Sequence, residues 1–328
     1  MGRITNQITP KVTLCSSCNN KEFLKYCFNC KEKTLKNMKE KEILGFFTNL
    51  FSEKIRRNEN LDSNFLRSLF KKKHLQAKPS IIINKNQMNI EYNDGSWKNS
   101  TLFYFCEKCL RISECLFEYN RHIQRCSFSS VPGILGYEKG NIKIYEVDGS
   151  LEKAFCKNLC RLGKCFLGHK TLEDQVDPYL FYVLVVKNEI VGFFSREKYF
   201  LKCSLSCIVT LPCYRGKGYG YIMIDYSYKL SIAKNCPGTP EKPLSDSGEA
   251  VYKKYWKYAI YKYLSGKKFA TIDEISCETG ICKDDIKNTL KETGSINEKN
   301  DITIDFSEIK DIPHILEGNI FFGKYFFE

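Results

Sequence analysis

The stretch LPCYRGKGYGYIMIDYSYKLS, from Leu211 to Ser231, predicts a strand end, a turn and a helix in succession. An apolar run stops at Pro212, a basic turn with alternating glycines follows, and apolar and aromatic residues then recur at helical spacing, at Tyr221, Ile224, Tyr228 and Ile232. This order directs unpaired backbone N–H groups and the positive end of the helix dipole to one point. The turn therefore predicts an anion site, most simply for phosphate. Its residues are Arg215, Gly216, Lys217, Gly218, Tyr219 and Gly220.

The composition is that of an ordinary soluble protein of two or three domains, with 43% hydrophobic and 27% charged residues among 328. No apolar stretch reaches the roughly 18 residues that a membrane span needs, and the N-terminal MGRITNQITPK lacks the apolar core of a signal peptide. We therefore expect the 17 cysteines to be reduced, in the cytosol or the nucleus. In those compartments metal binding is commoner than disulfide formation.

The positive charge is concentrated near the N-terminus. The whole chain carries +13, of which residues 1–75 supply +9, from 16 Lys and Arg against 7 Asp and Glu. Such a basic module fits a polyanionic partner such as DNA. It fits equally well a set of solvated lysines on helix faces, because charge alone sets attraction and not function.

The pattern divides the chain into four segments. IIINKNQMNIEYNDGSW predicts a β-hairpin that turns at Asp94-Gly95. FYVLVV and IVGFFS predict two strands joined by Lys187-Asn188-Glu189, and a third strand ends in CIVTLP. A helix is expected from about Val251. The expected segments are 1–75, a basic N-terminal module; 76–135, a hairpin and a zinc finger; 136–250, the core with the glycine turn; and 251–328, a helical C-terminal part.

FCEKCLRISECLFEYNRHIQRC has the spacing C-x2-C-x12-H-x3-C. A tight cysteine pair on a turn and two ligands one helical turn apart can close a tetrahedron around zinc. Leu110, Leu116 and Tyr119 would form the small core of this finger, and Cys115 is a spare thiol. The predicted ligands are Cys106, Cys109, His122 and Cys126.

A second zinc site is predicted in CSSCNNKEFLKYCFNC, where two CxxC pairs lie eight residues apart. Both clusters offer four protein ligands, whereas a catalytic zinc keeps one position open, so we expect structural zinc at both. The second set of ligands is Cys15, Cys18, Cys27 and Cys30.

Several stretches together resemble the MYST family of lysine (histone) acetyltransferases. LSCIVTLPCYRGKGYGYIMIDYSYKLS resembles the family's acetyl-coenzyme A motif, and the finger spacing is the family's as well. EVDGSLEKAFCKNLCRLGKCFLGHKTLEDQVDPYLFYVLV, GFFSREKYF and GTPEKPLSDSGEAVYKKYWKYAI add to the likeness, which covers about residues 80–325. The resemblance implies a mixed α/β fold: a GNAT-like acetyltransferase core with a winged-helix-like C-terminal segment.

By this resemblance the anion at the glycine turn is the pyrophosphate of acetyl-coenzyme A, and the glycines let the backbone approach it closely. Lys254 stands where the family usually has serine, which leaves that contact open. The residues implied in cofactor binding are Ile208, Val209, Thr210, Arg215, Gly216, Lys217, Gly218, Tyr219, Gly220, Ser245 and Lys254.

An acceptor lysine has a pKa of about 10.4, so its ammonium must lose a proton before it can attack a thioester. The resemblance implies Glu241 as the general base, with partial burial raising its pKa. Cys207 would lie at the acetyl group, either forming an acetyl-cysteine or lining the pocket during direct transfer; we favour direct transfer. The backbone N–H of Ile208 or its neighbours would then polarise the thioester carbonyl. Lys170 matches a lysine that acetylates itself in the family.

FATIDEISCETGICKDDIKNTLKETGSI has the pattern of a helix–turn–helix with Gly280 at the turn, and we expect it to be part of the catalytic domain. The resemblance implies a nuclear enzyme that acetylates histone tails on nucleosomes within a multi-subunit complex, with no membrane partner. Two alternatives remain open. One is an acetyltransferase for non-histone proteins, and the other is a catalytically dead chromatin-binding scaffold.

Overall fold

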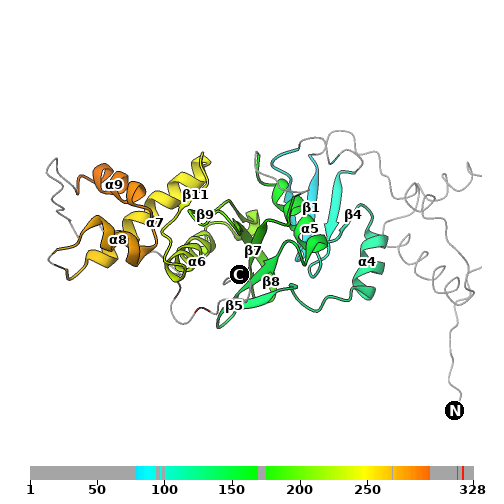
Figure 1. The fold of residues 1–328 in the computed structure, drawn as a ribbon. Helices are drawn as coiled ribbons and strands as arrows, with labels where there is room; N and C mark the ends of the chain where they lie inside the picture. The colour runs from blue at the N-terminus through cyan, green and yellow to red at the C-terminus, as the bar shows by residue number, and fades with distance from the viewer. Residues whose placement is uncertain are drawn as a thin grey trace, which may run out of the picture. The chain divides into compact units, whose positions relative to one another are not determined.

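The computed structural model describes residues 78–93, 97, 100–168, 175–267, 269–295, 316 and 320. The predicted Cys15–Cys30 zinc cluster and Lys170 lie outside the described residues. Within them, the chain folds around a central five-stranded sheet with helices on both faces (Figure 1). This mixed α/β architecture agrees with the predicted fold class. None of the helices in the described ranges has the length and apolar character that crossing a bilayer requires.

The central sheet is antiparallel throughout. FYVLVV and IVGFFS form two of its three interior strands and are buried on both faces, as their continuous apolar runs predict. Lys187 and Asn188 connect them with positive φ angles of 52° and 65°, the backbone of a tight hairpin turn. The strand order is β10 (Cys207–Thr210), β8 (Glu189–Glu197), β7 (Tyr179–Val186), β6 (Ile142–Asp148) and β5 (Ile134–Lys139).

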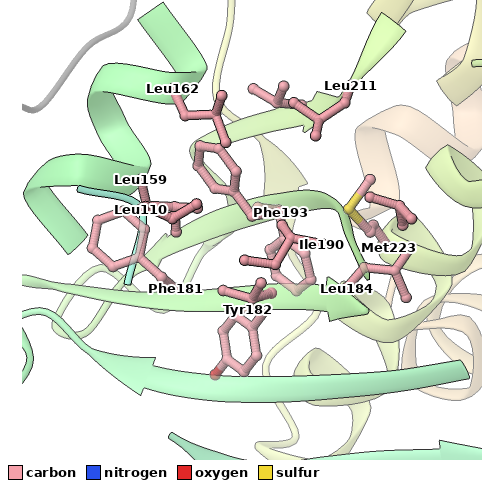
Figure 2. Close-up of a cluster of buried hydrophobic side chains, with 14 of the residues drawn as sticks. Leu110, Leu159, Leu162, Phe181, Tyr182, Leu184, Ile190, Phe193, Leu211 and Met223 are labelled. Atoms are coloured by element: carbon pink, nitrogen blue, oxygen red, sulfur yellow. The ribbon is translucent and has the colours of Figure 1, made fainter. Parts of the chain in front are cut away.

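Helix α5 (Lys153–Lys164) covers one face of this sheet, where a Cβ on Gly163 would come within 2.9 Å of the Phe193 ring. Figure 2 shows Phe193 pointing toward Leu162 of this helix, whereas Tyr182 points to the opposite side of the sheet. Cys156 and Cys160 of α5 are buried, which confirms the interpretation of this pair as helix-core thiols.

Helix α6 (Tyr219–Ala233) lies on the other face and is shared by two apolar cores. Its residues Met223 and Tyr226 face the sheet, and the Tyr226 ring lies 5.6 Å from that of Tyr182. The predicted stripe through Ile224 and Tyr228 instead packs against the C-terminal helices. Because both sides of α6 are covered, the helix is apolar nearly all round.

The C-terminal helices pack together beside α6 (Figure 1). Ser245 caps the first of them, so this helix begins at Asp246, five residues before the expected start. Gly280 ends the second with a φ of +72°, and a Cβ there would lie 2.7 Å from the Tyr228 carbonyl oxygen. Glycine is therefore required at the turn. The helices are α7 (Asp246–Leu264), α8 (Ile272–Thr279) and α9 (Lys283–Glu292).

A β-hairpin is present in this stretch, and its chain reverses at Asn84-Lys85, where φ is +50° and +62°. The predicted turn at Asp94-Gly95 lies outside the described residues. A parallel pairing then joins the first strand to a later one, forming a four-stranded sheet. Its order is β2 (Asn86–Asn89), β1 (Ser80–Ile83), β3 (Leu102–Phe105) and β4 (Ile112–Ser113).

Glu146 of β6 is a buried carboxylate with 1% of its surface exposed. Among the described residues its oxygens have no well-formed hydrogen bond, although the nearby Tyr182 hydroxyl and Lys234 ammonium lower its pKa against the larger effect of burial. Burial raises its pKa to about 6. A carboxyl group whose pKa rises on folding opposes folding above that pKa, and the penalty disappears below the unfolded-state value near 4.3.

We therefore expect Glu146→Gln to raise the free energy of unfolding at pH 7.5 by about 1–2 kcal/mol, and the gain to vanish at about pH 3.5, below both pKa values. Urea unfolding at both pH values measures it. Glu138→Gln is the control, because Glu138 is exposed and pairs only with Lys143 at the surface; its effect stays within about 0.5 kcal/mol. A loss of stability in Glu146→Gln at pH 7.5 would contradict the expectation.

Candidate functional site

The glycine turn lies between the edge strand β10 and the start of α6, after a short 3-10 helix, η1 (Pro212–Tyr214). Gly216 and Gly218 have φ angles of +77° and +84°, which side chains rarely adopt. In the described part of the chain, the backbone N–H groups of Gly216, Lys217 and Gly218 donate to no backbone oxygen. The N–H groups of Tyr219 and Gly220, the first two residues of α6, also donate to no backbone oxygen there, whereas Tyr221 N–H donates to Gly218 O at 3.0 Å.

Gly220 has an ordinary backbone conformation, and the space that a side chain at this position would occupy is open. A Cβ there would meet only the Thr210 hydroxyl oxygen, at 3.9 Å. Space beside a helix N-terminus with unpaired N–H groups is a cradle that an anionic group can fill. Arg215 contributes less than expected, because its N–H already donates to Pro212 O at 3.2 Å.

The small N-terminal sheet supports this turn from one side. The Arg215 guanidinium forms two hydrogen bonds with the Glu91 carboxylate, at 2.6 and 3.1 Å. The Tyr214 hydroxyl donates to Glu189 at 2.8 Å and accepts from the side-chain amide of Asn84 at 3.3 Å. The Arg215 side chain is therefore directed at Glu91, and the turn is held in place before any ligand binds.

Cys207 begins β10 and is half-buried. Strand β10 has a partner on one side only, and Leu211 N–H donates across to Val191 O. Alternate N–H groups of a strand point the same way, so those of Ile208 and Thr210 face the open side. Val209 is buried against α5. An N–H donor on the open side is available to an acyl oxygen near Cys207.

Glu241 follows the short strand β11 (Thr239–Pro240), which pairs with β9 (Cys203–Leu205). Its N–H donates to Leu205 O at 2.9 Å, and Leu205 lies two residues before Cys207. The two candidate catalytic residues therefore belong to one region, although they are far apart in sequence. Glu241 is exposed, so the expected partial burial of this carboxylate is wrong.

The helix–turn–helix holds the segment that carries Glu241. Gly238 N–H donates to Gly280 O at 2.8 Å, and Cys282 N–H donates back to Gly238 O at 3.0 Å. Lys242 donates to the buried carboxylate of Asp285 on α9 at 2.9 Å, which raises the pKa of Lys242. These contacts join α8 and α9 to the segment that carries Glu241.

Two residues at this site were missed by the sequence reasoning. Ser195 is the register partner of Cys207, is fully buried, and its hydroxyl has no hydrogen-bond partner in the described structure. Burial raises the pKa of Tyr179, and the negative charges of Glu197 and Glu241 raise it further. Tyr179 is the register partner of Glu197, two residues along β8 from Ser195. Neither residue carries a sequence signal, because strand pairing alone brings them to the site.

The remaining predicted cofactor residues lie on α7. The Ser245 hydroxyl accepts from Gly248 N–H at 3.2 Å and caps this helix. Lys254 is exposed, and its ammonium lies 5.9 Å from the centre of the Tyr221 ring. The attraction between a cation and an aromatic face holds the Lys254 ammonium beside the first turn of α6.

The predicted finger ligands converge. The ligand atoms of Cys106, Cys109, His122 and Cys126 all lie within 4.8 Å of one another. The first pair sits between β3 and β4, and the second pair at the end of α4 (Leu116–Arg125).

The distances suit a tetrahedral ion. Cys106 Sγ and Cys126 Sγ are 3.8 Å apart, the edge of about 3.8 Å expected for two zinc–sulfur bonds of about 2.3 Å. Cys109 Sγ and His122 Nε2 are 3.1 Å apart. The donor set and geometry therefore fit zinc. Of the expected finger core, Leu110 is buried, but Leu116 is 38% exposed, so its assignment was wrong.

Comparison with known proteins agrees with this arrangement. Residues 130–319 match the model of the MOZ/SAS family. Human histone acetyltransferase KAT6A is 43% identical over 194 residues, which cover 57% of this chain and 10% of KAT6A. Human histone acetyltransferase KAT6B is 40% identical over 203 residues, 60% of this chain and 10% of KAT6B. The chain thus spans about a tenth of the length of these relatives. It belongs to the MOZ/SAS family, the MYST family that its motifs resemble.

Proposed function

We propose that this protein is a lysine acetyltransferase that moves the acetyl group of acetyl-coenzyme A to lysine side chains of histone tails. The proposal is supported by a glycine turn whose N–H groups donate to no backbone oxygen in the described residues, together with Glu241, whose N–H is bonded to Leu205, two residues before Cys207. Relatives named histone acetyltransferases support the same activity.

In the proposed reaction the turn binds the pyrophosphate of acetyl-coenzyme A through backbone N–H groups. Glu241 accepts a proton from the acceptor lysine, whose amine attacks the thioester directly. The open N–H groups of β10 stabilise the carbonyl oxygen as it gains charge. Cys207 lines the acetyl site, and Ser245 and Lys254 lie toward the cofactor.

The rest of the proposal concerns the chain's surroundings. We propose a nuclear, chromatin-bound protein that acts in a multi-subunit complex, and a winged-helix-like C-terminal part that completes the catalytic domain. The segments 1–75, 76–135, 136–250 and 251–328 would be its domains. The basic residues 1–75 would hold a second zinc and dock on nucleosomal DNA or a partner, and Lys170 would be the site of self-acetylation.

The test is radiolabelled acetyl transfer from acetyl-coenzyme A to core histones, nucleosomes and a panel of non-histone peptides. We expect label on histone lysines. Label confined to non-histone peptides would favour an acetyltransferase of other proteins. Coenzyme A binding with no turnover on any substrate would favour a catalytically dead scaffold.

Replacing Gly218 with alanine tests the cofactor turn. We expect the affinity for coenzyme A to fall by at least about 10-fold, because alanine disfavours a φ of +84° by about 1–2 kcal/mol and displaces the N–H groups. Isothermal titration calorimetry measures it. Gly140→Ala is the matched control: Gly140 also has positive φ, +59°, with no atom within 4 Å of a Cβ, in the β5–β6 turn. Equal coenzyme A affinity in the two variants would contradict the role of the turn.

A further inference from the structure

The loop between β8 and β9 exposes three consecutive large apolar side chains. Tyr199, Phe200 and Leu201 are 83%, 56% and 37% exposed, and we call them the apolar loop. Leu151, 60% exposed, lies in the adjoining turn, since Lys198 Nζ reaches Ser150 Oγ at 3.4 Å. Four of the eight exposed large hydrophobic residues in the described structure thus gather here. Such gathering on a protein surface marks an interaction site.

The backbone of the apolar loop is fixed by hydrogen bonds. Lys198 N–H donates to Pro178 O at 2.9 Å, and Cys203 N–H donates to Phe200 O at 3.1 Å. The guanidinium of the buried Arg196 donates to Leu201 O at 3.2 Å. The apolar side chains are therefore presented on an ordered turn, which lowers the entropy cost of binding a partner.

The apolar loop is continuous with the candidate acetyl-transfer site. Thr239 N–H donates to Lys202 O at 3.0 Å, directly after the loop and two residues before Glu241. Cys207 lies six positions after Leu201 in the chain, a span of at most about 20 Å at about 3.3 Å per residue. An extended substrate covers that distance with about six residues.

Between the apolar loop and the candidate site lie the carboxylates of Glu197 and Glu241 and one exposed cation, Lys202. Tyr179 is the register partner of Glu197, and the charges of Glu197 and Glu241 both act on its phenol. Lys198, at the start of the loop, is neutralised by Asp148 at 2.7 Å. Carboxylates near the acceptor position attract a lysine cation, and the adjacent apolar surface can contact an apolar side chain of the same substrate.

We propose that the apolar loop recognises an apolar side chain of the protein substrate, within about six residues of the acceptor lysine. The inference rests on the proposed acetyl transfer and names a specificity determinant for it. The protein substrate is the occupant because the loop leads directly into the strands that hold Glu241 and Cys207.

The test uses two peptides of equal length and charge, each with one acceptor lysine. One peptide carries leucine at positions two to six from that lysine, and the other carries serine at the same positions. We expect the wild type to prefer the leucine peptide by at least about 10-fold in kcat/KM. The double variant Tyr199→Ser/Phe200→Ser should lose that preference. Phe269→Ser is the matched control, because Phe269 is 93% exposed but lies between α7 and α8, and it should keep the preference.

Binding of the same peptides by fluorescence anisotropy separates this inference from the proposed function. If the wild type transfers no acetyl group to either peptide, the proposed function fails, and a leucine preference in binding that the double variant loses still supports the apolar loop. The inference is overturned if the wild type shows equal kcat/KM and equal affinity for both peptides. It is also overturned if the double variant keeps the leucine preference. A change of the double variant from oligomer to monomer with its preference intact would assign the loop to a second copy of the chain.

Discussion

Glu241→Gln is expected to lower kcat for acetyl transfer by at least about 100-fold, because glutamine cannot accept a proton and general-base catalysis contributes about 10²–10⁴. Transfer would then depend on the small fraction of acceptor lysine that is already neutral. The fold should be unaffected, since Glu241 is exposed and its contact with Leu205 is made by the backbone N–H. Steady-state acetylation of a histone peptide measures the loss.

The pH dependence separates a base from a merely structural carboxylate. As pH rises toward the lysine pKa of about 10.4, more acceptor arrives as free amine and needs no base. The ratio of wild-type to Glu241→Gln activity should therefore shrink with rising pH. Glu278→Gln is the control, since Glu278 is an exposed glutamate on α8. A constant ratio across the pH range would count against proton removal by Glu241.

Cys207→Ala is expected to lower kcat less than Glu241→Gln does. In direct transfer the acetyl group needs room beside residue 207 but forms no bond with its thiol. The variant distinguishes the two mechanisms left open by the sequence. A loss as large as that of Glu241→Gln, with an acetylated wild-type enzyme trapped by rapid quenching, would establish a covalent acetyl-cysteine route instead.

Local patterns were sufficient for most of the central fold. β7, β8 and α6 could be predicted because continuous apolar runs and helical spacing are strong local signals. The first hairpin shows where local signals are weak. Its turn at Asn84-Lys85 contains no glycine and was not predicted, because the sequence reasoning relied on the stronger turn signature of Asp94-Gly95. The parallel pairing of β1 with β3 has no local signal at all.

The residues of the candidate site also fall into two groups, those that local sequence predicts and those that it does not. The four finger ligands occupy two short local segments, so their spacing alone predicts that they converge. The group of Glu241, Ser195 and Tyr179 around Cys207 depends on the pairing of β8 with β10 and of β9 with β11. Long-range strand pairing of this kind cannot be derived from spacing. The exposure of Glu241 has the same origin, since burial depends on the elements that pack around a residue.

Loss of the finger zinc is expected to have the second large effect, on stability. Binding of structural zinc to finger peptides contributes about 10–16 kcal/mol. Helix α4 depends on this site, because none of its residues is buried in an apolar core. Cys109→Ser, which removes a buried ligand, should release the ion and lower the melting temperature by more than about 10 °C. Zinc content by mass spectrometry and thermal unfolding measure the two effects.

Cys115→Ser is the matched control for this variant. Cys115 is also buried and directly precedes α4, but it does not belong to the ligand group. It should keep its zinc and lose little stability. Since the Cys15–Cys30 cluster is predicted to hold a second ion, Cys109→Ser should lower the zinc content from two per chain to one.

The effect of zinc loss should also reach the cofactor turn. β3 pairs with β1, and the hairpin of β1 and β2 leads to Asn84 and Glu91, which hold Tyr214 and Arg215. If the finger unfolds, this support weakens, and coenzyme A affinity should fall in Cys109→Ser although no ligand-binding residue has changed. A Cys109→Ser protein that retained its zinc and melting temperature would show that the four side chains do not form a metal site. Unchanged coenzyme A affinity after zinc loss would show that the glycine turn is rigid without the small sheet.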